Sequence, residues 1–307
     1  VQYWNTVDGF SMDRLELVRS QGSVQYGSDA LGGTMNILTA DTGYLAADPG
    51  WFQQGSAQYR FDTNSSSHVG RLQTRFGDGK NWGASLGLTG KNFGDIRDSG
   101  VGRMKNTGYP EQNLDLKVET LLNPSTRLTF AHQYLNQDDV WRWHSTIYND
   151  TPWNNTSTGS YAARIYDQER SLTYLKVTGD LIDSPVQNYS ATLSFQRSQD
   201  SAFQDRSATD VRTQVIDVDT IGLDVQLESD LLGGNLVYGI DYYRDSIESG
   251  GTRTGRDPRS RRPVADDSTY HLLGAFAQLR KPLNQRLETT FGARITHAEA
   301  ELGKVWD

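Results

Sequence analysis

One glycine-rich stretch comes close to a catalytic motif. Gly27 is followed by four residues and then by Gly32, Gly33 and Thr34. A phosphate-binding loop has this spacing, but it needs a lysine where Gly33 stands and a helix whose N-terminus holds the anion. The strand-like run 35–39 follows instead. The pattern therefore predicts a structural role for Gly27, Gly32 and Gly33, because glycine permits positive φ angles and close backbone approach.

A second stretch gathers acids, an arginine, tryptophans and a histidine, and it is the candidate for ligand contact. Its members are Asp138, Asp139, Trp141, Arg142, Trp143 and His144. Carboxylates and guanidinium groups bind polar groups, and tryptophan rings stack on aromatic or sugar ligands. The alternative interpretation is an aromatic girdle at a membrane boundary that continues into a solvated loop. As a haem ligand His144 would stand alone, because no second histidine has a useful spacing.

Other patterns that resemble catalytic or metal-binding motifs lack the surrounding structure or the spacing that those motifs need. Gly83, Ser85 and Gly87 match the nucleophile elbow of hydrolases, but that elbow needs a strand-to-helix turn, and this stretch lies inside an alternating segment. The aspartates at 217, 219, 266 and 267 lack the spacing of a calcium loop. There is no His-Glu-x-x-His motif and no cysteine. We therefore predict no catalytic residue, no metal site and no cofactor, and we do not expect an enzyme.

The bulk composition narrows the class of protein. The formal net charge is -8, which argues against a nucleic-acid surface because such a surface needs clustered lysine and arginine. No apolar run approaches the ~20 residues of a membrane-spanning helix. One membrane class stays open, the transmembrane β-barrel, because its strands alternate apolar and polar residues and therefore average out as polar.

From about residue 51 the chain alternates apolar and polar residues in segments of roughly ten. In one of them, Leu114, Leu116 and Val118 alternate with acidic and basic residues. This period is typical of a strand whose two faces meet different surroundings. We expect eleven strands, near 51–61, 67–76, 81–90, 112–121, 126–136, 169–179, 188–198, 219–229, 235–245, 268–280 and 286–296.

The connections between these strands differ in length at the two ends of the predicted sheet. The short ones are 77–80, 122–125, 180–187, 230–234 and 281–285, whereas the long ones are 91–111, 137–168, 199–218 and 246–267. Outer-membrane barrels have short turns at one end and long loops at the other. Aromatic residues such as Tyr134, Trp141 and Tyr242 fall near strand ends, as in a membrane girdle. The sequence therefore predicts an all-β protein, a transmembrane antiparallel β-barrel.

The region ahead of the strands carries a family resemblance. Residues 13–19, DRLELVR, and residues 22–37, GSVQYGSDALGGTMNI, resemble the end of the plug domain of TonB-dependent outer-membrane receptors. The likeness runs through residues 10–39. The family usually has Arg-Gly-Pro where this chain has Arg19, Ser20 and Gln21, a departure that concerns one turn. A weaker local likeness, at 133–146, is to family members that take up haem and host iron.

The resemblance implies an architecture. In the family a plug sits inside a barrel of about 22 strands. Residues 1–45 are then the C-terminal part of the plug, and residues 46–307 are the N-terminal half of an incomplete barrel, with about 11 of about 22 strands. We therefore expect the chain to be an internal fragment. Gly27, Gly32 and Gly33 would form a plug turn close to the barrel wall, and Arg14, Glu16 and Arg19 would pair with that wall. The alternative for these charges is a solvated strand face.

The resemblance also implies a task. Family members lie in the outer membrane of Gram-negative bacteria and take up a ferric siderophore, haem or a similar large scarce ligand. A TonB-type energy-coupling protein supplies the work, so the expected partners are that protein, outer-membrane lipid and an iron chelate or other small ligand, with no nucleic acid.

Three other functions compete with this expectation. A passive porin would lack a plug, and sugars would diffuse through it without energy coupling. A barrel that anchors a surface binding protein, an adhesin or an enzyme would carry a passenger domain, and none is visible. A soluble all-β binding domain would express as a monomer without detergent.

Overall fold

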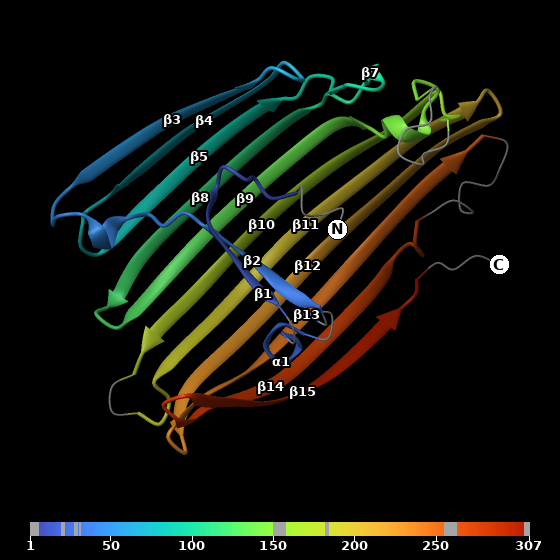
Figure 1. The fold of residues 1–307 in the computed structure, drawn as a ribbon. Coiled ribbons are helices and arrows are strands. Elements are labelled where there is room, and N and C mark those ends of the chain that lie inside the picture. The colour runs from blue at the N-terminus through green and yellow to red at the C-terminus, as the bar shows by residue number, and fades with distance from the viewer. Residues whose placement is uncertain are drawn as a thin grey trace.

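The computed structural model describes residues 6–19, 22–27, 30, 32–149, 158–181, 184–254 and 263–303. Most of them form one antiparallel sheet of eleven strands, in which each strand pairs with its neighbours in the chain (Figure 1). The eleven predicted strands are thereby confirmed. Their bounds are β3 (Phe52–Asp62), β4 (Ser67–Gly77), β5 (Trp82–Asn92), β8 (Pro110–Asn123), β9 (Thr126–Trp141), β10 (Ala163–Asp180), β11 (Asn188–Ser207), β12 (Asp210–Leu231), β13 (Gly234–Arg253), β14 (Ser268–Asn284) and β15 (Leu287–Glu301).

The sheet curves around a hollow, and within the described residues β3 and β15 are its two edges. At one end of the strands every connection is short, and we call it the tight-turn end. The longer connections lie at the opposite end, which we call the loop end, together with the short turns at 63–66 and 208–209. Between β5 and β8 the loop end carries a small hairpin, β6 (Arg97–Asp98) with β7 (Gly102–Arg103).

Several strands are longer than predicted. The expected long connection at 199–218 is wrong, because β11 and β12 continue as a paired hairpin up to a turn at residues 208 and 209. The 22 residues of β12 span about 70 Å at ~3.3 Å each, whereas about 9–11 residues cross a bilayer. β12 is therefore about twice as long as a strand needs to be to cross a bilayer. At the loop end, the outer face of β11 and β12 carries polar residues such as Asp217 and Asp219, so the apolar alternation stops while the backbone pairing continues.

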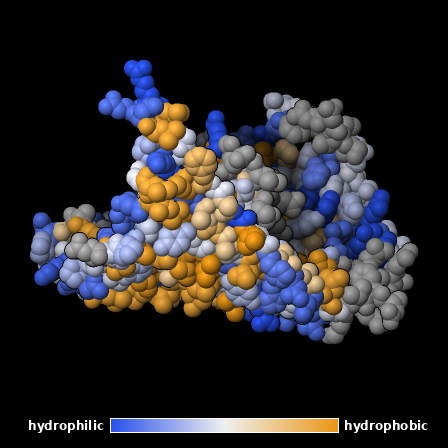
Figure 2. Space-filling view, turned by 90° about the horizontal axis from the view of Figure 1, so that it is seen from below, coloured by the Kyte–Doolittle hydropathy of each residue, from blue (hydrophilic) through white to orange (hydrophobic). Residues whose placement is uncertain are grey.

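The register assigns side chains to the two faces, because directly opposed residues of antiparallel strands point the same way. Leu88, Leu114 and Tyr134 face outward together, whereas Asp115 and Gln133 face the hollow. Figure 2 shows hydrophobic residues gathered along the convex side and hydrophilic residues around the hollow. The apolar half of each alternating segment thus faces away from the hollow. Within the described part of the chain, no helix is long and apolar enough to cross a membrane.

The chain ahead of β3 lies on the concave side of the sheet (Figure 1). It contains β1 (Met12–Arg19) and β2 (Gly33–Thr39), which pair antiparallel, and between them the short helix α1 (Ser23–Tyr26). The 3-10 turn η2 (Tyr44–Ala46) leads to β3. We call residues 6–45 the plug segment. The proposed division between residues 45 and 46 falls within η2.

The three glycines of the plug turn differ in their surroundings. Gly27 has φ 95° and Gly33 has φ 141°, which is the region that favours glycine. A Cβ on Gly33 would lie 2.4 Å from the carbonyl oxygen of Val18, whereas one on Gly32 would meet nothing within 4 Å. The backbone that closely approaches Gly33 is therefore the partner strand of its own hairpin, and not the barrel wall.

Candidate functional site

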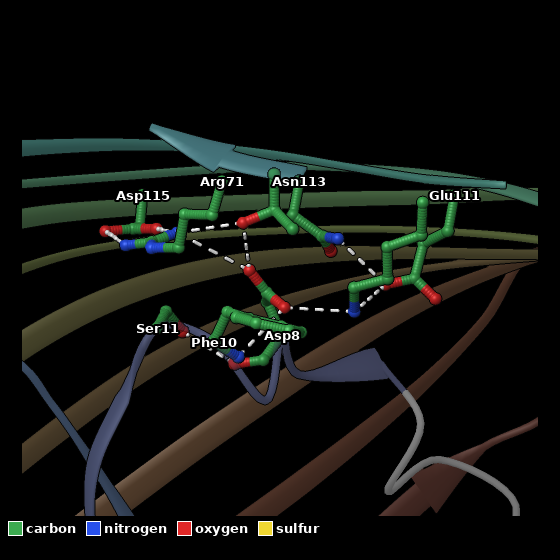
Figure 3. Close-up of polar contacts among 9 residues, drawn as sticks. Asp8, Phe10, Ser11, Arg71, Glu111, Asn113 and Asp115 are labelled. Carbon is green, nitrogen blue, oxygen red and sulfur yellow. Dashed lines mark hydrogen bonds and ion pairs between the residues drawn. The ribbon is translucent and has the colours of Figure 1, made fainter. Parts of the chain in front are cut away.

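A buried aspartate joins the plug segment to the wall of the hollow (Figure 3). Asp8 precedes β1, and 7% of its surface is exposed. Its Oδ2 accepts a hydrogen bond of 2.6 Å from the Thr89 hydroxyl and lies 3.5 Å from Nη1 of Arg71. Its Oδ1 lies 3.0 Å from Nζ of Lys91. Asp8 is thus held by two cations and one hydroxyl that belong to β4 and β5.

The wall side of this contact is a paired network in its own right. Arg71 donates to both carboxylate oxygens of Asp115, at 2.7 and 3.0 Å. Lys91 donates to Glu111 at 2.5 Å, and Asn113 donates to the same oxygen at 2.8 Å. We call Asp8, Arg71, Lys91, Glu111 and Asp115 the Asp8 cluster. Such buried charges are tolerated because each is paired and hydrogen-bonded.

A second contact lies nearer the tight-turn end. Lys117 on β8 donates from Nζ to the backbone carbonyls of Thr39 and Ala40, at 3.0 and 2.8 Å. The hydroxyl of Thr42 donates to Oε2 of Glu119 at 2.7 Å. These bonds fix the exit of β2 against the wall, where Thr42 is fully buried.

A third contact holds α1 against the far side of the hollow. Arg294 on β15 pairs with Asp241 on β13 at 2.6 Å. Its Nη1 also donates a long hydrogen bond of 3.5 Å to the carbonyl of Val24. A Cβ on Gly292 would lie 3.0 Å from both methyl carbons of Val24 and 3.4 Å from its Cβ. Gly292 therefore leaves room for the helix, and this contact is held by packing and one weak hydrogen bond.

The charges predicted to pair with the wall are placed differently. Arg14 and Glu16 lie on one face of β1 and pair with each other at 2.9 Å, with Arg14 exposed and Glu16 half-buried. Arg19 is exposed at the end of β1. Among the described residues, it is Asp8 that forms ion pairs between the plug segment and the wall, with Arg71 and Lys91. Sequence reasoning did not select Asp8. The wall partners of Asp8 can be recognised in the sequence, because Arg71, Lys91 and Asp115 are charged residues at the inward positions of alternating strands.

A cluster of arginines and tyrosines covers the inner face at the loop end. The guanidinium carbon of Arg142 lies 4.8 Å from the ring centroid of Tyr166. Arg164 lies 5.8 Å from the same ring and 5.7 Å from that of Tyr161, and Arg206 lies 5.6 Å from Tyr161. We call these five residues the loop-end patch. Arg164 and Tyr166 lie on β10 and Arg206 lies on β11, whereas Arg142 and Tyr161 lie at the two ends of the connection from β9 to β10.

The patch adjoins a trio in which two arginines share one aspartate. Asp210 accepts two hydrogen bonds from Arg212 at 2.9 Å and one from Arg253 at 2.7 Å. These bonds hold the pKa of the Asp210 carboxyl well below its usual range. By contrast, no ion pair within the described residues provides a carboxylate for Arg142, Arg164 or Arg206. Counting only the residues that the structure describes, the loop-end patch therefore holds three positive charges without a paired carboxylate.

The six residues proposed for ligand contact separate into different surroundings. Arg142 belongs to the loop-end patch. Trp143 is buried, so its ring is covered, and His144 is exposed beside the patch. Burial lowers the pKa of His144, as do Arg164 and Arg142.

The remaining three lie away from the patch. Trp141 is opposite Ile165 on the outer face and stacks edge-on against Tyr148. Asp138 accepts a hydrogen bond from Asn136, which is also on the outer face. Asp139 has φ 56° at a bulge in β9 and donates its backbone N–H to Asp167. Within the described residues, no three His, Cys, Asp or Glu side chains are grouped so as to hold a metal ion.

Comparison with known proteins shows which solved structures share this architecture. No family model matches the sequence, and no curated protein matches it. Among solved structures, the copper transporter OprC has a TM-score of 0.76 at 14% identity, over 96% of this chain and 44% of its own. The FrpB iron transporter from Neisseria meningitidis has a TM-score of 0.72 at 13% identity, over 96% of this chain and 48% of its own. This chain has the fold of part of a TonB-dependent receptor.

A third solved structure extends the comparison. The hemophore receptor HasR of Serratia marcescens, solved with its hemophore HasA and heme, has a TM-score of 0.66 at 14% identity, over 96% of this chain and 48% of its own. The chain thus spans slightly less than half the length of the receptors that it matches. The predicted fold class, an all-β antiparallel sheet that forms part of a barrel, is confirmed.

Proposed function

We propose that this chain is part of a TonB-dependent receptor that imports a large scarce ligand across a Gram-negative outer membrane. The ligand class is a ferric siderophore, haem or a similar metal chelate, and the partners are outer-membrane lipid and a TonB-type energy-coupling protein. The observation that carries the proposal is the buried Asp8 cluster, through which a segment on the concave side of the sheet is fixed to the wall.

The chemistry of that interface suits a plug that must move. Asp8, Lys117 and Thr42 attach the plug segment by ion pairs and hydrogen bonds rather than by an apolar core. Water that enters a loosened interface can hydrate the groups on both sides, so the interface can separate without exposing large apolar surfaces. An energy-coupled pull therefore has a defined set of polar contacts to break. A passive pore has no use for such an arrangement, because diffusion requires an open hollow.

The test is uptake by the full-length receptor in cells that lack its gene. Iron-labelled siderophores and haem are supplied to cells with and without the energy-coupling protein. We expect uptake to require both the receptor and the coupling protein. Uptake that persists at the same rate without the coupling protein, together with sugar permeation in liposomes, would contradict the proposal and favour a porin.

A further inference from the structure

We infer that the loop-end patch is a binding site for an anionic ligand, a metal chelate that presents carboxylate or catecholate oxygens. The inference rests on the proposed function and specifies the charge of the cargo. It excludes neutral chelates, neutral sugars and bare metal cations as the preferred ligand of this site.

The first step is the charge balance. Three guanidinium groups, those of Arg142, Arg164 and Arg206, are held next to two tyrosine rings with no carboxylate paired to them in the described part of the chain. The ring faces attract these cations but carry no net charge. Arg142 and Arg164 approach the same ring, so they also repel each other. An anion bound between them would relieve this repulsion.

The second step concerns the hydrogen-bond donors of the loop-end patch that can still bind a ligand. Arg164 donates from Nη2 to the Tyr166 hydroxyl oxygen at 3.1 Å. A phenol that accepts through its oxygen keeps its own hydrogen for another acceptor. The planar guanidinium fork matches two oxygens of a carboxylate or of a catecholate. Arg142, Arg206 and Tyr166 thus offer donors to one ligand, and the rings of Tyr161 and Tyr166 offer apolar faces to an aromatic one.

The third step is the contrast with nearby arginines. Arg212 and Arg253 lie on the same inner face but share the carboxylate of Asp210, so each already has an anionic partner within the wall. Arg244 lies on the outer face, because it is opposite Ile221 and His271. The face that bears the loop-end patch is the one that surrounds the hollow, where an entering ligand must pass. Arg244 is therefore a matched control, since its loss removes the same charge from the other face.

The experiment measures binding to the full-length receptor, purified in detergent, at several salt concentrations. The probes are three anionic chelates, an iron tricatecholate, ferric citrate and haem, and one neutral chelate, an iron trihydroxamate. We expect one anionic chelate to bind most tightly and its affinity to fall as salt rises. The double variant Arg142→Gln/Arg164→Gln should lower the affinity for that chelate by at least about tenfold, because charged hydrogen bonds are lost. The control Arg244→Gln should leave the affinity unchanged.

Two results would overturn the inference. One is tightest binding of the neutral chelate, and the other is an affinity for anionic chelates that the double variant leaves unchanged. Coupled uptake of a neutral chelate would refute the anionic site while supporting the proposed function. Tight binding of an anionic chelate whose uptake needs no coupling protein would refute the function while the anionic site stands.

Discussion

Asp8 is the single residue on which the contact between plug segment and wall most depends. Arg71 and Lys91 keep Asp115 and Glu111 as partners when Asp8 is removed, so the wall stays neutralised while the plug segment loses its anchor. Sequence reasoning selected Arg14, Glu16 and Arg19 because the resemblance pointed to charges in a plug strand. Asp8 carries no local pattern, and only the three-dimensional register brings it opposite β4 and β5.

For Asp8→Ala in the full-length receptor, we expect a plug that is easier to displace, with the interface weakened by about 1–3 kcal/mol. Limited proteolysis of the plug should accelerate, while the heat-dependent electrophoretic mobility of the barrel stays normal. Arg14→Ala is the control, because an exposed ion pair contributes only about 0–1 kcal/mol. Equal proteolysis rates in the two variants would show that Asp8 is no anchor.

Two adjacent glycines provide a matched pair. We expect Gly33→Ala to destabilise the β1–β2 hairpin by about 1–3 kcal/mol, because its φ of 141° is strained for alanine and the new Cβ meets the Val18 carbonyl. Gly32→Ala should change stability by less than about 0.5 kcal/mol, since its Cβ enters open space. Hydrogen exchange of β1 and β2 measures the difference, and equal protection in both variants would refute the strain argument.

At the scale of elements, the alternation predicted the strands of the wall but not their ends. The pattern depends on a contrast between the surroundings of the two faces, and lipid supplies that contrast only within the membrane. In the loop-end parts of β11 and β12, polar Gln199, Asp217 and Asp219 share the outer face with apolar Phe203 and Val215, so the alternation is broken and gave no strand signal. The ladder continues there because backbone pairing does not depend on the side chains. Of the loop-end patch, sequence reasoning selected Arg142 alone, because Tyr161, Arg164, Tyr166 and Arg206 lie outside the strand bounds that the alternation predicted.

The turn between β4 and β5 should make stability depend on pH. Asp78 accepts hydrogen bonds from the backbone N–H groups of Trp82, Lys80 and Asn81, which lower its pKa from 3.8 to about 2. Because the folded pKa is depressed, this stabilisation is complete above the unfolded value and is lost as pH falls from about 4 to about 2. Thermal unfolding from pH 6 to 2 should show a smaller loss for Asp78→Asn than for the wild type. Parallel curves would contradict this assignment.

The two ends of the sheet should lie on opposite sides of the membrane. These 307 residues have no cysteine, so a single thiol introduced among them into an otherwise cysteine-free receptor reports its own location. Thr209→Cys, at the loop end, should react with a membrane-impermeant maleimide on intact cells. Gly233→Cys, in a tight turn, should react only after the cells are opened. The reverse labelling would place the loop-end patch on the inner side and refute its role as the entry site.

At the scale of the whole molecule, a curved wall holds a segment on its concave side. The three contacts differ in strength, because the Asp8 cluster is ionic and buried, whereas α1 rests on packing and one long hydrogen bond. The resemblance in residues 10–39 predicted that a plug would be present. How it is fastened depends on pairs such as Arg294 with Val24, which lie 270 positions apart, and no sequence pattern connects them.

The central claim is that the plug segment must leave the wall for the ligand to pass, and a reversible cross-link tests it most directly. The Cβ of Val24 and a Cβ built on Gly292 lie 3.4 Å apart, close to the ~3.8 Å typical of a disulfide. We predict that oxidised Val24→Cys/Gly292→Cys receptor binds its ligand as the wild type does but does not import it, and that a reductant restores import. Import at the wild-type rate while the disulfide is intact would contradict the account.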